Sequence, residues 1–164
     1  MQPWSVPLIV ATAAFLAVLL WRVRPAVLGG KDRAAREALR AAHARVAAAK
    51  DDATRAEALC DAAELVVRDL RGPASAAALY QRAMRAAPAS SAVVERAVKT
   101  LAHRPRALEA LLWRRLAATE WDAASIPAVR TALSALAHLY EGPLKNAVRA
   151  RALAHARDAM ATRP

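Results

Sequence analysis

Apolar residues recur at steps of three and four positions along the chain from residue 51 onward. This spacing places them on one face of an α-helix and predicts a series of amphipathic helices. Six apolar stripes follow one another: Leu59, Ala63, Val66, Val67 and Leu70; Leu79, Tyr80, Ala83 and Met84; Val94, Ala97, Val98 and Leu101; Leu108, Leu111, Leu112 and Leu116; Ile126, Val129, Leu133, Leu136 and Tyr140; Leu144, Val148, Ala152, Ala156 and Met160. A weaker apolar face around Leu39 and Val46 predicts one further helix from Lys31 to Lys50.

Capping residues and glycine–proline pairs mark the predicted helix ends. The helix after residue 50 has Asp51 and Asp52 as cap candidates, or a capping box formed by Thr54 and Glu57. Gly72-Pro73 ends that helix, and a proline suits the first turn of the next one because its missing N–H is not needed there. The connections are short, so consecutive helices are expected to pack as antiparallel hairpins.

The first 24 residues have a different pattern, because no charged side chain occurs before Arg22. An apolar run that includes Phe15 lies between Trp4 and Trp21, which are roughly 26 Å apart along a helix. Two tryptophans at this separation are typical of interfacial anchors. Residues 1–24 are therefore predicted to form a transmembrane anchor.

A cleaved signal peptide and a buried core helix are the alternatives for this segment. A signal peptide begins with basic residues, whereas the basic residues here follow the apolar run. By the positive-inside rule, the basic residues after the span place the C-terminal part in the cytoplasm and the N-terminus outside; they are Arg22, Arg24, Lys31, Arg33 and Arg36. We expect Arg22, Arg24, Lys31 and Arg33 to contact lipid headgroups, with residues 25–50 forming a basic juxtamembrane linker and helix.

Composition supports an all-α fold and a bacterial origin. Of the 164 residues 47 are alanine, the best helix former, while the residues that favour strands are sparse. Arginine outnumbers lysine by 21 to 4, which together with the alanine content indicates a GC-rich genome. With the apolar N-terminal run, this predicts a location in a bacterial inner membrane.

The segment from about Ala56 to Pro88 resembles a tetratricopeptide repeat. Such a repeat is a pair of helices with small residues, an aromatic residue and a proline at set offsets. Ala76, Tyr80, Ala83 and Pro88 have the spacing of that family's second helix. The first helix lacks the family's Trp, Gly and Tyr, and the later helices match the repeat weakly. The resemblance implies that residues 51–164 form stacked helical hairpins, a tetratricopeptide-repeat-like α-solenoid.

Proteins with such repeats are typically scaffolds that bind peptides on a concave face, which is built from the first helix of each pair. The resemblance implies that Arg55, Asp61, Glu64 and Arg68 lie on such a face and contact a partner protein. An ordinary solvated helix surface is the alternative for each of these four side chains.

The sequence contains no recognisable catalytic, metal-binding or cofactor-binding motif. The four histidines lack the HxxxH and HExxH spacings of metal sites, and no glycine-rich phosphate loop is present. Cys60 lies beside an apolar stripe, where a packed side chain is a better interpretation than a nucleophile. We expect no enzyme activity, no metal and no cofactor.

The net charge of +11 comes from two parts of the chain. Residues 22–50 have a net charge of +6, residues 51–102 balance, and residues 103–164 have +5. An acidic partner, nucleic acid and a plain arginine-rich solvated surface are the alternatives for the last part, of which the solvated surface is favoured. Its arginines include Arg104, Arg106, Arg114, Arg115, Arg149, Arg151 and Arg157.

The sequence therefore predicts a membrane-anchored adaptor or scaffold whose helical hairpins bind another protein on the cytoplasmic side. A basic nucleic-acid-binding helical protein held at the membrane is the alternative function. Few aromatic residues and no recognition motif argue against nucleic acid as a partner.

Overall fold

A computed structural model describes Phe15, residues 30–70 and residues 72–161. All regular structure in these residues is helical. The helices are α2 (Gly30–Ala48), α3 (Asp52–Leu70), α4 (Pro73–Ala86), α5 (Ser91–Leu101), α6 (Pro105–Ala118), α7 (Ile126–Glu141) and α8 (Ala147–Ala161).

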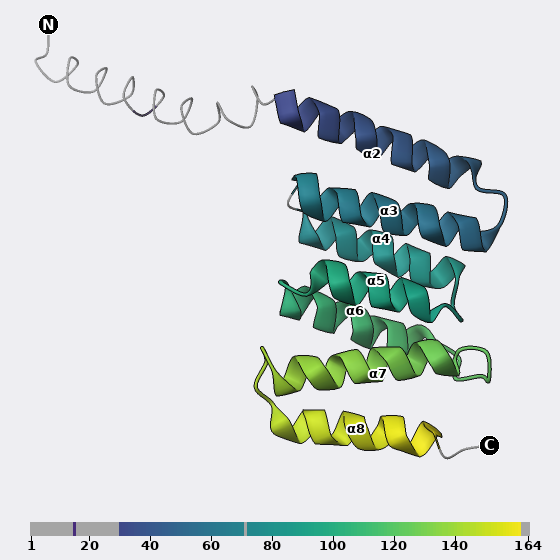
Figure 1. Cartoon of the computed structure of the whole chain (residues 1–164), viewed down its shortest axis with the longest axis vertical. Helices are drawn as coiled ribbons and strands as arrows, with labels where there is room; N and C mark the ends of the chain where they lie inside the picture. The colour runs from purple at the N-terminus through teal and green to yellow at the C-terminus, as the bar shows by residue number, and fades with distance from the viewer. Residues whose placement is uncertain (1–14, 16–29, 71, 162–164) are drawn as a thin grey trace, which may run out of the picture.

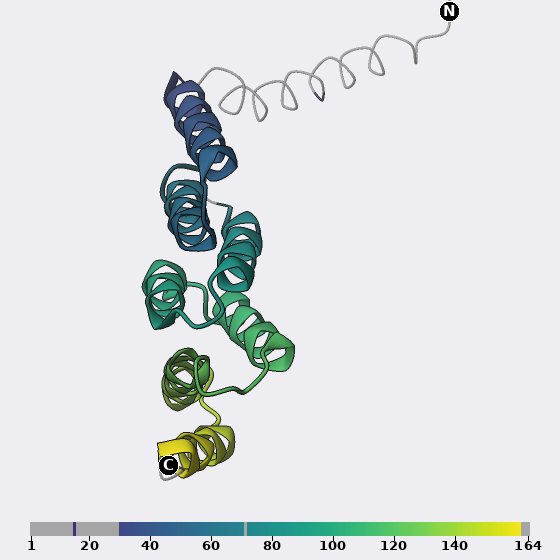
Figure 2. The same cartoon turned by 90° about the vertical axis from the view of Figure 1, so that its right-hand side faces the viewer.

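The helices stack in chain order from α2 to α8 and form an elongated array (Figure 1). From α3 onward, α3, α5 and α7 lie in one layer and α4 and α6 in a second layer behind it (Figure 2). Contacts join each helix to the next in the chain, and α3 to α5, α4 to α6 and α5 to α7. We call the layer of α3, α5 and α7 the front layer, because it faces the viewer in Figure 1.

The predicted breaks between helices are confirmed by local backbone chemistry. The Asp51 carboxylate accepts the backbone N–H of Thr54 at 2.7 Å and its hydroxyl at 2.8 Å, so Asp51 caps α3. These hydrogen bonds lower the pKa of the Asp51 carboxyl. At Gly72 the chain passes so close to α3 that an added Cβ would lie 3.1 Å from Val66 Cγ1. Pro73 follows in the first turn of α4, where no N–H is required.

Alanine forms much of the core between the helices. Two buried tyrosines, Tyr80 in α4 and Tyr140 in α7, are its largest fully buried side chains. Small side chains allow two helix axes to approach closely, because the spacing depends on the residues at the contact. The alanines with no exposed surface are Ala42, Ala62, Ala63, Ala76, Ala83, Ala97, Ala128 and Ala132.

The predicted fold class included a transmembrane helix, and that part of the prediction is corrected. No helix in the described ranges is long and apolar enough to cross a membrane. A span requires about 20 consecutive apolar residues. The two longest helices, α2 and α3, have 19 residues each and carry charged residues along their length.

Most of the predicted anchor, residues 1–24, falls outside the described residues. Phe15 is the exception, and 64 % of its surface is exposed. Lys31 and Arg33, predicted to contact lipid headgroups, lie in the first turns of α2. The inner-membrane location depended on this anchor and stays a prediction from the sequence. The anchor and headgroup residues outside the described part are Trp4, Trp21, Arg22 and Arg24.

The predicted apolar face of the last helix is also wrong in part. Val148 is 71 % exposed, and Ala152 and Ala156 are exposed as well. The structure buries Ala150 and Leu153 instead. In an alanine-rich helix the apolar stripe is too weak to select a face, so packing against α7 decides which residues are buried.

Candidate functional site

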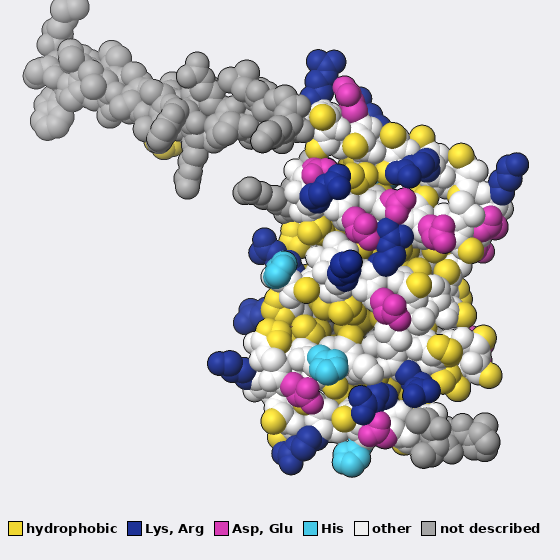
Figure 3. Space-filling model, viewed as in Figure 1, with side chains coloured by type: hydrophobic (Ala, Val, Ile, Leu, Met, Phe, Trp, Pro, Cys, Tyr) yellow, Lys and Arg dark blue, Asp and Glu magenta, His cyan; other side chains and the backbone are white. Residues whose placement is uncertain are grey.

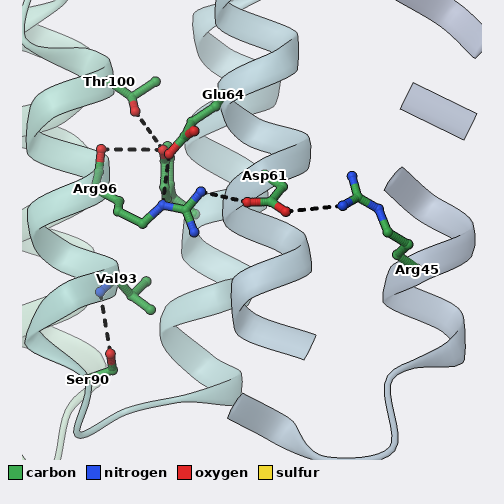
Figure 4. Close-up of polar contacts among 8 residues, drawn as sticks. Arg45, Asp61, Glu64, Ser90, Val93, Arg96 and Thr100 are labelled. Carbon is green, nitrogen blue, oxygen red and sulfur yellow. Dashed lines mark hydrogen bonds and ion pairs between the residues drawn. The ribbon is translucent and has the colours of Figure 1, made fainter. Parts of the chain in front are cut away.

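A cluster of charged side chains joins α3 to α5 in the front layer (Figure 4). The guanidinium of Arg96 in α5 donates from Nε to Glu64 Oε1 at 2.8 Å and from Nη2 to Asp61 Oδ1 at 2.7 Å. Both acceptors belong to α3. One arginine thus binds two carboxylates of the neighbouring helix through charge-assisted hydrogen bonds, and the side-chain hydrogen bond to Glu64 raises the pKa of Arg96.

The cluster continues to α2 through Asp61. Arg45 in α2 donates from Nη1 to Asp61 Oδ2 at 3.3 Å, so Asp61 lies between two arginines (Figure 4). We call the four residues Arg45, Asp61, Glu64 and Arg96 the charge network. Their side chains are between 33 % and 58 % exposed, so water screens the network and each carboxylate keeps an accessible edge.

Buried hydroxyl and thiol groups lie directly behind the charge network. The Tyr80 hydroxyl shares a 2.7 Å hydrogen bond with Thr100 Oγ1 and donates to the Arg96 carbonyl at 3.4 Å. Burial raises the pKa of Tyr80 to about 12 and that of the Cys60 thiol to about 11. Both groups are therefore neutral near pH 7, which favours a packing role for Cys60 over a nucleophilic one.

The structure brings together two of the four predicted partner-binding residues. Asp61 and Glu64 both belong to the charge network. Arg55 instead pairs with Asp52 of its own helix at 2.7 Å. Arg68 is 72 % exposed and pairs with the adjacent Asp69 at 2.9 Å.

The four residues that carry the repeat resemblance have two different surroundings. Ala76, Tyr80 and Ala83 have no exposed surface and pack in the core between the two layers. Pro88 is exposed after the end of α4, and its carbonyl accepts a hydrogen bond from Arg115. Tyr80 also reaches beyond its own hairpin, because its hydroxyl contacts α5.

No protein family model matches this chain. No curated protein and no solved structure matches it either. The resemblance to tetratricopeptide repeats thus stays a prediction, and the chemistry of the site has to be argued from its own residues.

Sequence reasoning missed the two arginines of the charge network. Arg96 lies 32 residues after Glu64 and 35 after Asp61, a separation that is close to one helical hairpin. Opposite charges on two predicted helices about one hairpin apart in the sequence were the available signal. Arg45 lies in the predicted juxtamembrane helix, outside the predicted hairpin domain, so the sequence pattern does not indicate its pairing with Asp61.

A second polar cluster joins the last three helices around Tyr140. The Tyr140 hydroxyl donates to Glu109 of α6 and accepts a hydrogen bond from Trp113 Nε1 at 3.1 Å. The guanidinium of Arg149 in α8 lies 5.5 Å from the centre of the Tyr140 ring, a cation–π distance. Arg149, one of the arginines of the basic C-terminal part, is thereby tied to the fold.

The charge network joins α2, α3 and α5 through charge-assisted hydrogen bonds and leaves its carboxylates partly exposed. Within residues 30–70 and 72–161, no group of three His, Cys, Asp or Glu side chains has the arrangement of a metal site. The arginines of the network act only as hydrogen-bond donors.

Proposed function

We propose that this protein is a protein-binding scaffold, in which the front layer of α3, α5 and α7 contacts a partner polypeptide. The observation that carries the proposal is the continuity of that layer, since α3 packs on α5 and α5 on α7. Such an arrangement presents an extended surface along which a partner polypeptide can bind.

The chemistry of the front layer supports a polypeptide partner. Acidic and basic side chains lie beside one another over the upper helices of this face (Figure 3). The described part of α5 adds exposed Glu95 and Lys99 between the two neighbouring helices. Interleaved charges give specificity toward a complementary mixed surface, whereas they disfavour the uniform charge of a nucleic-acid backbone.

Site-specific photo-crosslinking tests the proposal. A crosslinking amino acid replaces Lys99 on the exposed side of α5, and the full chain is expressed in its native cells and irradiated. We expect a discrete crosslinked product whose second protein is identified by mass spectrometry. A matched control has the same crosslinker at Ala78, which is exposed on α4 in the layer behind.

The proposal predicts a product at Lys99 that is absent at Ala78. Equal labelling at Lys99 and Ala78 would contradict it. So would the absence of any product when the crosslinker stands at Lys99, at Glu95 in α5 or at the exposed Arg130 in α7. The nucleic-acid alternative has a separate test in electrophoretic mobility shifts across salt concentrations. Tight binding that persists near physiological salt would favour that alternative over the scaffold.

A further inference from the structure

A cavity of about 360 Å³ opens between the C-terminal ends of α4 and α6 and the segment that joins α6 to α7. Figure 2 looks toward the edge of the array where these connections lie. Met84 and Leu111 are among the apolar residues of its wall, and three arginines, Arg85, Arg114 and Arg115, also line it. The cavity lies outside the front layer and shares no residue with the charge network.

Arg115 is the unusual residue of this cavity. Only 8 % of the residue's surface is exposed, and Nη2 donates a hydrogen bond to the Pro88 carbonyl. The buried Nε has no hydrogen-bond partner within the described residues. Burial lowers the pKa of the guanidinium without a compensating carboxylate. An arginine stays protonated in proteins, so the wall contains a buried positive charge that pairs with no carboxylate among the described residues.

The two acidic side chains of the lining, Glu120 and Asp122, form no ion pair with Arg115 among the described residues. Asp122 accepts the backbone N–H of Ser125 at 2.9 Å, and hydrogen bonds from Ser125 lower the pKa of this carboxyl. Asp122 is therefore engaged in the turn that precedes α7. Glu120 is exposed, and no ion pair joins it to Arg115 in the part of the chain that the structure describes. Three arginines against two carboxylates leave the lining with a net charge of +1.

We propose that this cavity binds a monoanionic carboxylate with a short apolar chain, and that Arg115 binds the carboxylate. The planar guanidinium matches the two oxygens of a carboxylate, and Arg115 lines the cavity with an Nε that has no partner among the described residues. Apolar surface for the rest of the ligand comes from the exposed lining residues Pro88, Ala89, Ala118 and Ala124. We call this cavity the Arg115 pocket.

The net charge of the lining and the volume of the Arg115 pocket indicate which anions it can bind. One monoanion neutralises the net charge of the lining, whereas a dianion such as a phosphate would leave an excess of negative charge beside Glu120 and Asp122. The volume is at the lower end of the range of about 300–1,000 Å³ that is typical of small-molecule sites. It fits a branched carboxylic acid or the terminal residue of a peptide, and both sources present the same carboxylate.

Binding to the purified full chain tests the Arg115 pocket by ¹H–¹⁵N NMR titration. The probes are 4-methylpentanoate and its neutral amide. We expect the acid to shift amide signals of α6 near Leu111 and Arg115, and the amide to leave them unchanged. Arg115→Met should weaken acid binding by at least about tenfold, since it removes a charge-assisted hydrogen bond.

Two variants keep the test independent of misfolding. Arg106→Met changes an exposed arginine on the same helix that does not line the pocket, and it should bind the acid like wild type. Ala118→Leu retains Arg115 but fills part of the pocket, and it should bind weakly while its circular dichroism stays helical. Wild-type affinity in the Arg115→Met protein would overturn the proposal, as would equal binding of acid and amide.

A peptide arm distinguishes the two sources of the carboxylate. N-acetyl-Ala-Leu with a free C-terminus is compared with its C-terminal amide and with 4-methylpentanoate. Tighter binding of the free peptide than of the small acid identifies a peptide end as the ligand, and the reverse order identifies a small acid. Absence of binding by every carboxylate up to millimolar concentrations, or preference for inorganic phosphate over them, would contradict the pocket as proposed.

Discussion

Arg96 and Arg115 belong to the two helices of one hairpin and have opposite environments. Arg96 in α5 is about one third exposed and binds two carboxylates of α3. Arg115 in α6 is more deeply buried, and the one hydrogen-bond acceptor described for it is a backbone carbonyl. The better hydrated arginine thus has the anionic partners, while the buried one has none among the described residues.

This difference distinguishes an arginine that stabilises the fold, Arg96, from one that is available to bind a ligand, Arg115. At the junction of α3, α4 and α5, the charged groups of the charge network pair with one another. The Tyr80 hydroxyl is hydrogen-bonded and the Cys60 thiol is neutral. Polar groups satisfied in this way are expected of a structural contact. At the junction of α4 and α6, a buried cation lines a cavity. Uncompensated charge in a folded protein is costly, and such sites are often functional.

The first prediction concerns Tyr80, whose ring fills the junction behind the charge network. Tyr80→Ala leaves a cavity where an aromatic side chain had no exposed surface, and it should lower the free energy of unfolding by roughly 3–5 kcal/mol. Tyr80→Phe removes only the hydroxyl that contacts Thr100 and should cost about 1 kcal/mol. Urea unfolding followed by circular dichroism measures both. Similar losses for the two variants would show that the hydrogen bond, and not the ring, holds this junction.

The second prediction concerns alkaline pH and the Cys60 thiol. Its pKa in the folded protein is about 11, raised from 9.0, so the unfolded chain releases the thiol proton first as the pH rises. The folded state then binds more protons than the unfolded state. The free energy of unfolding should therefore be intact below pH 9 and fall by about 2 kcal/mol from this group as the pH approaches 11.

Cys60→Ala provides the control for the alkaline effect. Unfolding is measured at pH 8 and pH 11 in both proteins, and the difference within each protein is compared, so that any loss at neutral pH cancels. The variant should lose less stability than wild type over this interval. Tyr80, with its pKa raised to about 12, contributes a remaining decline in both proteins. Identical declines would mean that the thiol is not desolvated in the fold.

The third prediction concerns Arg96 itself. Arg96→Met leaves Asp61 and Glu64 without their shared partner, but all three side chains are about a third or more exposed. Because water screens the network, the loss in free energy of unfolding should be only about 1 kcal/mol. High salt should narrow the gap between variant and wild type. A gap that is unchanged in 1 M salt, about seven times physiological ionic strength, would argue that the loss comes from packing.

The sequence identified most of the helices because their signals are local. Asp51 caps α3 through its own side chain, and Gly72-Pro73 separates α3 from α4 by backbone chemistry alone. The last helix was harder, since alanines on all sides leave periodicity without a preferred face. Val148, on the predicted apolar face, is exposed and Leu153 is buried instead, because contact with α7 decides which side of α8 is buried.

The candidate sites depend on contacts that a linear pattern does not contain. Asp61 was predicted to face a partner, and its pairing with Arg96 requires the packing of α5 on α3. Arg115 belonged to a basic part of the chain that was interpreted mainly as solvated surface. A local signal was present, however, because Arg115 lies four residues after Leu111 and next to Leu116, on the apolar face of α6. Charge composition alone could not separate it from exposed neighbours such as Arg114.

The fourth prediction has the smallest effect on stability and decides the contrast between the two arginines. Arg115→Met replaces a buried cation that lacks an anionic partner with an apolar side chain of similar length. Removing that charge relieves its desolvation cost, while the lost hydrogen bond to the Pro88 carbonyl acts in the opposite direction. The free energy of unfolding should therefore stay within about 1 kcal/mol of wild type, or rise, in the same urea experiment that shows a loss for Arg96→Met. A loss larger than that of Arg96→Met would mean that Arg115 stabilises the hairpin, and the reason for regarding it as a free binding group would disappear.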